Sequence, residues 1–170
     1  FFARENGFLR ADRVLETFRI RAEAHKARRQ HGCRVQSIES HQGGVRVTTD
    51  EETFDAAQVI ITAGAWLDRL AEDLNWQLRV TREEKIYLPV NDPTRVVPGD
   101  FPCFCEYDTT FYGFPSLDGK TIKVAADHSG QEVDPDSVNR DVDTEGIQRL
   151  YDWVERWQPG LVDSNGHGEV

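Results

Sequence analysis

Hydrophobic residues recur at helical spacing in two segments of the chain. From Asp12 to about His31 they lie three or four positions apart with arginine and glutamate between them, which predicts an amphipathic helix that has Asp12 as N-cap and ends at Gly32. A second set, in residues 144–157, forms one apolar face and is followed by Pro159-Gly160, which terminates helices. The pattern therefore predicts one helix near each end of the sequence.

Between these helices, polar and apolar residues mostly alternate. Residues 33–38 and 45–49 alternate on either side of Gly43-Gly44, which predicts a β-hairpin. The apolar run 58–62 is typical of a strand buried on both faces of a sheet. We further predict a short helix at 67–73, a surface loop at 91–99, and strands at 78–80, 84–90, 104–107, 110–114 and 121–126.

These elements predict an α+β fold, a mainly antiparallel sheet with covering helices. The chain divides into two parts of different character. Residues 1–70 hold a helix, the hairpin and the buried strand, whereas residues 71–170 hold the antiparallel strands and the second helix.

Charge and composition exclude several classes of partner. The net charge of -10 argues against nucleic acid, whose binding depends on clustered lysine and arginine. No apolar run approaches the roughly 18 residues of a membrane span, so we expect no membrane partner and a cytoplasmic protein. Cys33, Cys103 and Cys105 do not have the spacing of metal ligands, so we expect reduced thiols and no metal site.

Several short motifs carry the chemistry. At 59–66 an apolar run leads into Ala63-Gly64-Ala65-Trp66, where a glycine after a strand allows the backbone to approach a bulky ligand closely. Further motifs follow at 101–102, 112–116, 123–124, 130–131 and 134–140. In order and spacing these motifs resemble FAD-dependent amine oxidases of the D-amino-acid oxidase superfamily, in particular the monomeric sarcosine oxidases and N-methyltryptophan oxidases.

The resemblance implies an enzyme that oxidises the C–N bond of a secondary or tertiary N-methyl amino acid such as sarcosine. Hydride would pass to FAD and the electrons to O2, giving H2O2, with the protein placing the substrate and setting the electrostatics. A glycine-oxidase-like or D-amino-acid-oxidase-like flavoenzyme is the alternative within this class. An alternative of another class is a non-catalytic α+β module that binds a small ligand.

The resemblance also implies roles for individual residues. Lys123 matches a lysine that lies over the flavin and activates O2, where a cation stabilises developing negative charge. Tyr112 matches a tyrosine that lines the substrate cavity, with a core aromatic residue as the alternative. Phe104 and Phe114 are candidates for the walls of the cavity, although ordinary core packing is the favoured interpretation for each of them. The cofactor-binding residues implied by the resemblance are Val35, Ala63, Gly64 and Trp66.

One position departs from the family pattern. Related enzymes have a histidine four residues after the matching lysine, where this chain has Asp127 followed by His128. A shift of one residue turns a side chain to the other face of a strand, so these two residues are not equivalent. We expect His128, re-aimed by a local bulge, to face the cavity as a catalytic residue, with Asp127 near the substrate.

The resemblance implies that the chain is an internal fragment. Residues 1–70 would then be part of the FAD-binding domain and residues 71–170 the substrate domain. The G-x-G-x-x-G motif would precede Phe1, and the cysteine that tethers FAD would follow Val170. We therefore expect the isolated chain to be inactive and to bind FAD weakly or not at all.

Overall fold

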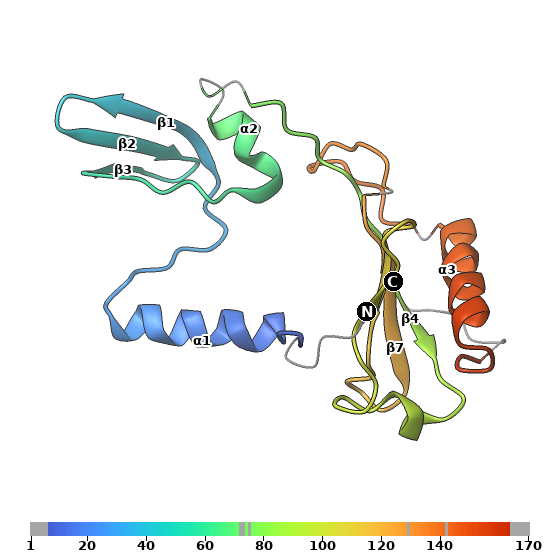
Figure 1. The fold of residues 1–170 in the computed structure, drawn as a ribbon. Coiled ribbons are helices and arrows are strands. Elements are labelled where there is room, and N and C mark those ends of the chain that lie inside the picture. Colours follow the sequence, from blue (N-terminus) through green and yellow to red (C-terminus); the bar gives the residue numbers. More distant parts are fainter. Residues whose placement is uncertain (1–6, 72–73, 75, 129, 142, 164–170) are drawn as a thin grey trace. The chain divides into compact units, whose positions relative to one another are not determined.

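The protein, seen in a computed structural model, folds into two compact units (Figure 1). The structure describes residues 7–71, 74, 76–128, 130–141 and 143–163. One unit is Leu9–Val80, and the other consists of residues 7–8 together with the chain from Thr81 onward. Both units contain antiparallel sheets and helices, so the predicted α+β class is confirmed.

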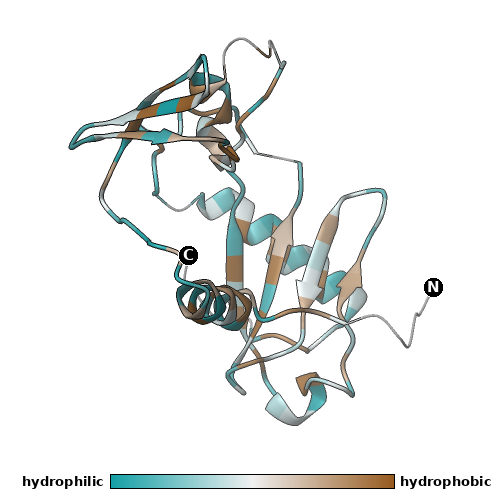
Figure 2. Cartoon of the chain, turned by 90° about the vertical axis from the view of Figure 1, so that its left-hand side faces the viewer, coloured by the Kyte–Doolittle hydropathy of each residue, from teal (hydrophilic) through white to brown (hydrophobic). Residues whose placement is uncertain are grey.

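The unit that begins at Thr81 is built on a four-stranded antiparallel sheet. Its strands are β4 (Lys85–Pro89), β5 (Phe104–Cys105), β6 (Phe111–Phe114) and β7 (Thr121–Ala126), in the order β4-β7-β6-β5. Hydrophobic and hydrophilic residues alternate along β4 and along the first four residues of β7 (Figure 2). The two faces of the sheet therefore differ in character, as the sequence pattern predicts.

Helix α3 (Thr144–Trp157) packs beside β4 and β7 and covers one face of this sheet (Figure 1). Asp143 caps the helix by accepting a hydrogen bond from the Glu145 backbone N–H at 3.1 Å. The core lies between the helix and the strands and consists of Ile86, Leu88, Val96, Ile122, Val124, Leu150, Trp153, Val154, Leu161 and Val162. Burial of this apolar face holds the sheet and helix together.

Gly113 is required for packing on the core face. A Cβ atom at this position would lie 2.2 Å from Cζ of Phe104, the residue directly opposite on β5. The Phe104 ring is thus free to stack on Trp153, with ring centroids 5.6 Å apart. The glycine of the 112–116 motif therefore serves the core, while its two aromatic neighbours point to the other face.

The Leu9–Val80 unit contains helix α1 (Ala11–Ala24) and a three-stranded antiparallel sheet in the order β1-β2-β3. Its strands are β1 (Val35–His41), β2 (Gly44–Thr49) and β3 (Thr53–Ala56). The predicted hairpin is confirmed, and Gly43 adopts a φ of 107° in its turn, a conformation that favours glycine.

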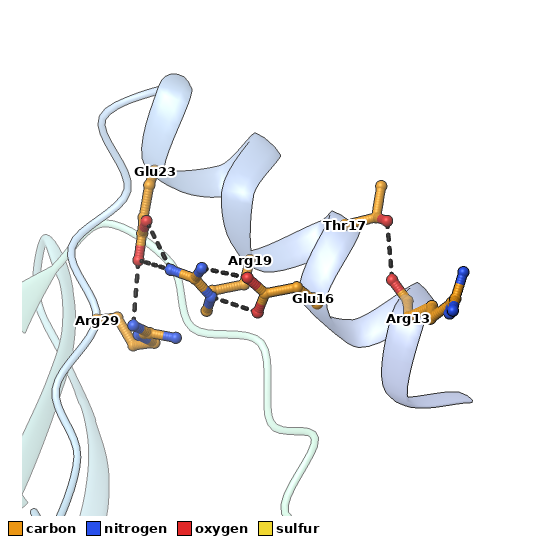
Figure 3. A network of polar contacts seen from close by, with 6 residues as sticks. All are labelled: Arg13, Glu16, Thr17, Arg19, Glu23 and Arg29. Carbon is orange, nitrogen blue, oxygen red and sulfur yellow. Dashed lines mark hydrogen bonds and ion pairs between the residues drawn. The ribbon is translucent and has the colours of Figure 1, made fainter. Parts of the chain in front are cut away.

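Ion pairs cover the polar side of α1 (Figure 3). Arg19 donates from Nε to Glu16 at 2.6 Å and from Nη1 to Glu23 at 2.9 Å, and Glu23 also pairs with Arg29 at 3.1 Å. The hydrogen bonds that Arg19 donates to the carboxylates of Glu16 and Glu23 raise its pKa above the ordinary value. Because these groups are exposed, the pairs favour the helix only slightly.

The structure corrects the predicted first helix. α1 ends at Ala24 rather than near His31, and Arg10 occupies the N-cap position, so Asp12 lies inside the first turn. None of the α1 residues is buried. Without tertiary packing, the helical pattern of the last predicted turn is not sufficient to continue the helix.

Four further predictions are corrected. Residues 58–62 form no strand and Ile60 is 88% exposed, because β3 is the edge of its sheet and no described strand pairs with this run. Residues 78–80 are likewise irregular. The loop 91–99 is not wholly at the surface, since its short 3₁₀ helix η3 (Pro93–Val96) buries Val96 completely. The predicted helix 67–73 is shorter, α2 (Leu67–Leu70), preceded by the 3₁₀ helix η1 (Gly64–Trp66).

Two features are absent from the described residues. None of the described helices is long and apolar enough to cross a membrane. In the same part of the chain, no group of three or more His, Cys, Asp or Glu side chains is arranged to hold a metal ion.

Candidate functional site

The sheet face opposite α3 carries the polar and aromatic residues of the candidate site. Lys123 on β7 lies directly across from Phe114 on β6 and from Tyr87 on β4. Tyr112 lies across from Ala125, two residues further along β7. Since directly opposed residues share a face, the register brings Lys123, Tyr112 and Phe114 together on it.

Lys123 is half-buried on this face. Its Nζ lies 5.0 Å from the centroid of the Phe114 ring, which is within the range of a cation–π contact. Burial lowers the pKa of the Lys123 ammonium, and the positive charge of Lys85, on the neighbouring strand β4, lowers it further. Lys123 is thus a partly desolvated cation, and the charge of Lys85 affects how readily it loses its proton.

Tyr112 is also half-buried. Its ring meets that of Phe114 edge to face, with centroids 5.8 Å apart. Burial raises the pKa of its hydroxyl, and the negative charges of Asp127 and Glu83 raise it further. The Tyr112 hydroxyl therefore stays protonated and remains a hydrogen-bond donor on this face.

The structure distinguishes the positions of Asp127 and His128. The Asp127 backbone continues the β6–β7 ladder by donating to the Thr110 carbonyl at 3.1 Å, so strand alternation places Asp127 on the face of Lys123. His128 adopts a φ of 58°, and its side chain is 83% exposed against 54% for Asp127. This placement favours Asp127 as the neighbour of Tyr112, and the catalytic role of His128 stays a prediction.

Glu83 fixes the chain beyond Asp127. Its carboxylate accepts hydrogen bonds from the Gly130 backbone N–H at 3.1 and 3.2 Å, and one of its oxygens accepts from Thr81 at 2.9 Å. Gly130 also packs so closely on Arg82 that a Cβ atom would lie 1.9 Å from the Arg82 carbonyl oxygen. The Gly130-Gln131 motif therefore anchors the end of β7 to the segment that precedes β4.

Phe104 lies on the other side of the sheet. It opposes Gly113 rather than Tyr112, and it packs in the core against Phe101 and Trp153. Because Phe104 and Tyr112 lie on opposite faces of the sheet, this position does not support the predicted role of Phe104 in lining the substrate cavity. It lines instead a largely apolar cavity of about 450 Å³ that includes residues of α3 and of the 101–106 segment.

The four predicted cofactor residues all belong to the Leu9–Val80 unit. Val35 begins β1 and pairs with Thr49 at the base of the hairpin. Ala63, Gly64 and Trp66 lie at η1, where Gly64 has a φ of 55° and open space around its Cβ position. A left-handed glycine with a free flank permits close approach of a ligand to the backbone, and their role in binding FAD remains a prediction.

Four residues near Lys123 and Tyr112 were not identified from the sequence. Alternation within the predicted strand 84–90 places Lys85 and Tyr87 together on one face, but it does not show which strand they adjoin. Phe8, whose ring centroid lies 6.1 Å from that of Phe114, and Glu83 come from segments outside the strands. No local pattern predicts such contacts.

Comparison with known proteins identifies relatives of this chain. It is 25% identical to a monomeric sarcosine oxidase of an Arthrobacter species, over 99% of this chain and 45% of the relative. It is 29% identical to the N-methyl-L-tryptophan oxidase of Yersinia pestis, over 94% of this chain and 43% of the relative. The chain thus spans about half the length of the curated relatives it matches.

Solved structures share the fold. The open form of NikD, an amino acid oxidase of nikkomycin biosynthesis, aligns with a TM-score of 0.64 at 22% identity, covering 90% of this chain and 41% of NikD. Glycine oxidase from Geobacillus kaustophilus aligns with a TM-score of 0.62 at 20% identity, covering 88% of this chain and 37% of that enzyme. The family profile described as FAD dependent oxidoreductase matches residues 1–168. The chain belongs to the FAD dependent oxidoreductase family.

Proposed function

We propose that the protein carrying this chain is an FAD-dependent oxidase of secondary or tertiary N-methyl amino acids such as sarcosine. The observation that carries the proposal is the sheet face on which Lys123 and Tyr112 lie together with Asp127, opposite the face covered by α3. Sarcosine oxidases and an N-methyl-L-tryptophan oxidase are among its relatives, which supports this substrate class.

The residues of this face suit a flavin and an amine. A half-buried lysine beside aromatic rings provides a cation next to flat apolar groups, which fits a flat heterocycle that accepts electrons. Bound FAD would supply hydride acceptance and the return of electrons to O2. We assign Val35, Ala63, Gly64 and Trp66 to FAD binding, and residues 1–70 and 71–170 to parts of the FAD-binding and substrate domains.

Individual side chains of this face would have separate roles in the reaction. Lys123 would stabilise the negative charge that develops on oxygen, because its ammonium is preorganised and partly desolvated. Tyr112 would orient the substrate through a hydroxyl that stays protonated. Asp127 would lie near the amine, and His128 is retained as a catalytic candidate. The partners of the protein would be the amine and O2, in the cytoplasm.

Replacing Lys123 with Met in the product of the complete reading frame tests the proposal. Reoxidation of the reduced enzyme by O2 should slow by about 10²–10³, the usual effect of losing one preorganised electrostatic group, while reduction by sarcosine changes little. Lys120→Met is the matched control, because Lys120 is an exposed lysine at the turn before β7. Stopped-flow absorbance measures both half-reactions, and equal losses in the two would contradict the assigned role.

A substrate panel scored by peroxide release tests the substrate class. Sarcosine and other N-methyl amino acids should be turned over faster than glycine or D-alanine. Preference for glycine or a D-amino acid would establish the glycine-oxidase-like or D-amino-acid-oxidase-like alternative. A purified protein that holds no flavin and releases no peroxide would instead favour the non-catalytic binding module.

A further inference from the structure

The ammonium of Lys123 is supported by an aromatic ring rather than by a carboxylate. Phe114 lies directly across from Lys123 in the β6–β7 ladder and places its ring centroid 5.0 Å from Nζ. No described carboxylate lies within 4.0 Å of Nζ to form an ion pair with it. The attraction between the cation and the negative face of the ring is therefore the identified interaction that favours the charged form.

Phe114 is itself in contact with two further aromatic rings. The ring of Tyr112 meets it at 89° with centroids 5.8 Å apart, and the ring of Phe8 meets it at 76° with centroids 6.1 Å apart. Edge-to-face contacts of this kind restrict how an aromatic ring turns. A restrained ring directly opposite Lys123 limits in turn the positions that its ammonium occupies.

An aromatic support has a consequence that an ion pair would not have. A carboxylate beside Lys123 would neutralise much of its charge, whereas a ring stabilises the ammonium and leaves the full positive charge available. This matters because the surroundings disfavour the cation through burial and through the charge of Lys85. Within the described residues, the Lys123 ammonium thus keeps its charge beside a ring and without a carboxylate partner, despite partial desolvation.

We propose that Phe114 is a positioning residue that holds the Lys123 ammonium for the reaction with O2 without neutralising it. The part of this proposal that concerns the reaction with O2 rests on the proposed function. The contact between the ring and the ammonium can be measured without any turnover, so the two can fail separately.

The contact is tested by NMR on the product of the complete reading frame, after reductive methylation of its lysines with ¹³C-formaldehyde. Lys123→Arg identifies the resonance of Lys123. Phe114→Leu should move this resonance by removing the ring current of the nearby ring, whereas Phe114→Tyr should leave it in place. Tyr87→Leu is the matched control, since Tyr87 flanks Lys123 from the other neighbouring strand, and it should cause a smaller change. A resonance unaffected by Phe114→Leu would overturn the proposal.

The catalytic consequence is tested by stopped flow. Phe114→Leu should slow reoxidation by O2 by about tenfold, the scale expected when a partly desolvated cation–π contact is lost, and should slow reduction by sarcosine less. Phe114→Tyr should restore reoxidation to within about twofold of the wild-type rate, because the ring is what matters.

If Phe114→Leu does not fold, Phe114→Met, which has no ring, replaces it in both experiments. Equal slowing of both half-reactions, or failure of Tyr to restore the rate, would overturn the positioning role. Absence of any amine oxidation would refute the proposed function, and the NMR result would still decide the contact.

Discussion

At the scale of single residues, Lys85 and Lys123 are coupled by charge across β4 and β7. The positive charge of Lys85 adds to burial in lowering the pKa of Lys123. Lys85→Gln removes the second contribution, so the pKa of Lys123 should rise toward its ordinary value. Lys123 then keeps its proton to higher pH, and the alkaline decline of the reoxidation rate should move upward. The pH profile of reoxidation measures this shift, and Lys120→Gln should leave the profile unchanged.

Asp127 and Tyr112 form a second coupled pair. Burial first, and then the charge of Asp127, raise the pKa of the Tyr112 hydroxyl. Asp127→Asn should therefore lower that pKa, and His128→Asn should have a smaller effect, because the exposed His128 side chain lies in a left-handed turn beyond the strand. Ultraviolet titration of tyrosinate, with Tyr112→Phe identifying the transition, measures the change. A larger effect from His128→Asn would show that His128 and not Asp127 faces Tyr112.

At the scale of elements, Gly113 determines how β6 packs on β5 and α3. Gly113→Ala would place a methyl group 2.2 Å from the Phe104 ring, which must leave its stacked position on Trp153. Overpacking of this kind typically costs about 1–3 kcal/mol of unfolding free energy, to be measured by urea denaturation. Adding Phe104→Ala to Gly113→Ala should cost less than the two single effects combined, because the clash disappears. Strict additivity would contradict the packing role.

Elements whose cause is local were predicted well from the sequence. Helix α3 begins after an Asp143 cap and keeps its apolar face, and the alternation in 110–114 and 121–126 places Lys123 and Tyr112 on one face. Elements that depend on a partner strand far away in the sequence were not predicted well. The run 58–62 has the composition of a buried strand, but composition does not supply a neighbouring strand to pair with it.

The same distinction applies to the candidate site. Lys123, Tyr112 and Phe114 are adjacent in one hairpin, so short motifs were sufficient to bring them together. Phe8 and Glu83 reach the site from outside that hairpin, through a ring contact and through hydrogen bonds to the Gly130 backbone. Such long-range contacts follow from the packing of the whole unit, which no periodicity within one segment encodes.

At the scale of the whole molecule, the two units differ in how much they bury. The core lies in the unit that begins at Thr81, where Ile86, Ile122 and Val124 are fully buried. In the described part of Leu9–Val80, Thr49 is the one buried residue, and α1 leaves Leu15 and Phe18 largely exposed. Local stability follows the density of buried apolar contacts, so the two units should open with different free energies.

Amide hydrogen exchange on the 170-residue chain tests this difference. Amides of β7 should exchange at least roughly a hundredfold more slowly than those of α1, because opening the central strand exposes the core whereas fraying the helix exposes little. Ile122→Ala, which removes a fully buried side chain, should speed exchange in β7 and leave α1 unchanged. Leu15→Ala is the matched control in the other unit and should leave exchange in β7 unaffected. Equal protection of α1 and β7 would mean that the two units unfold as one cooperative body.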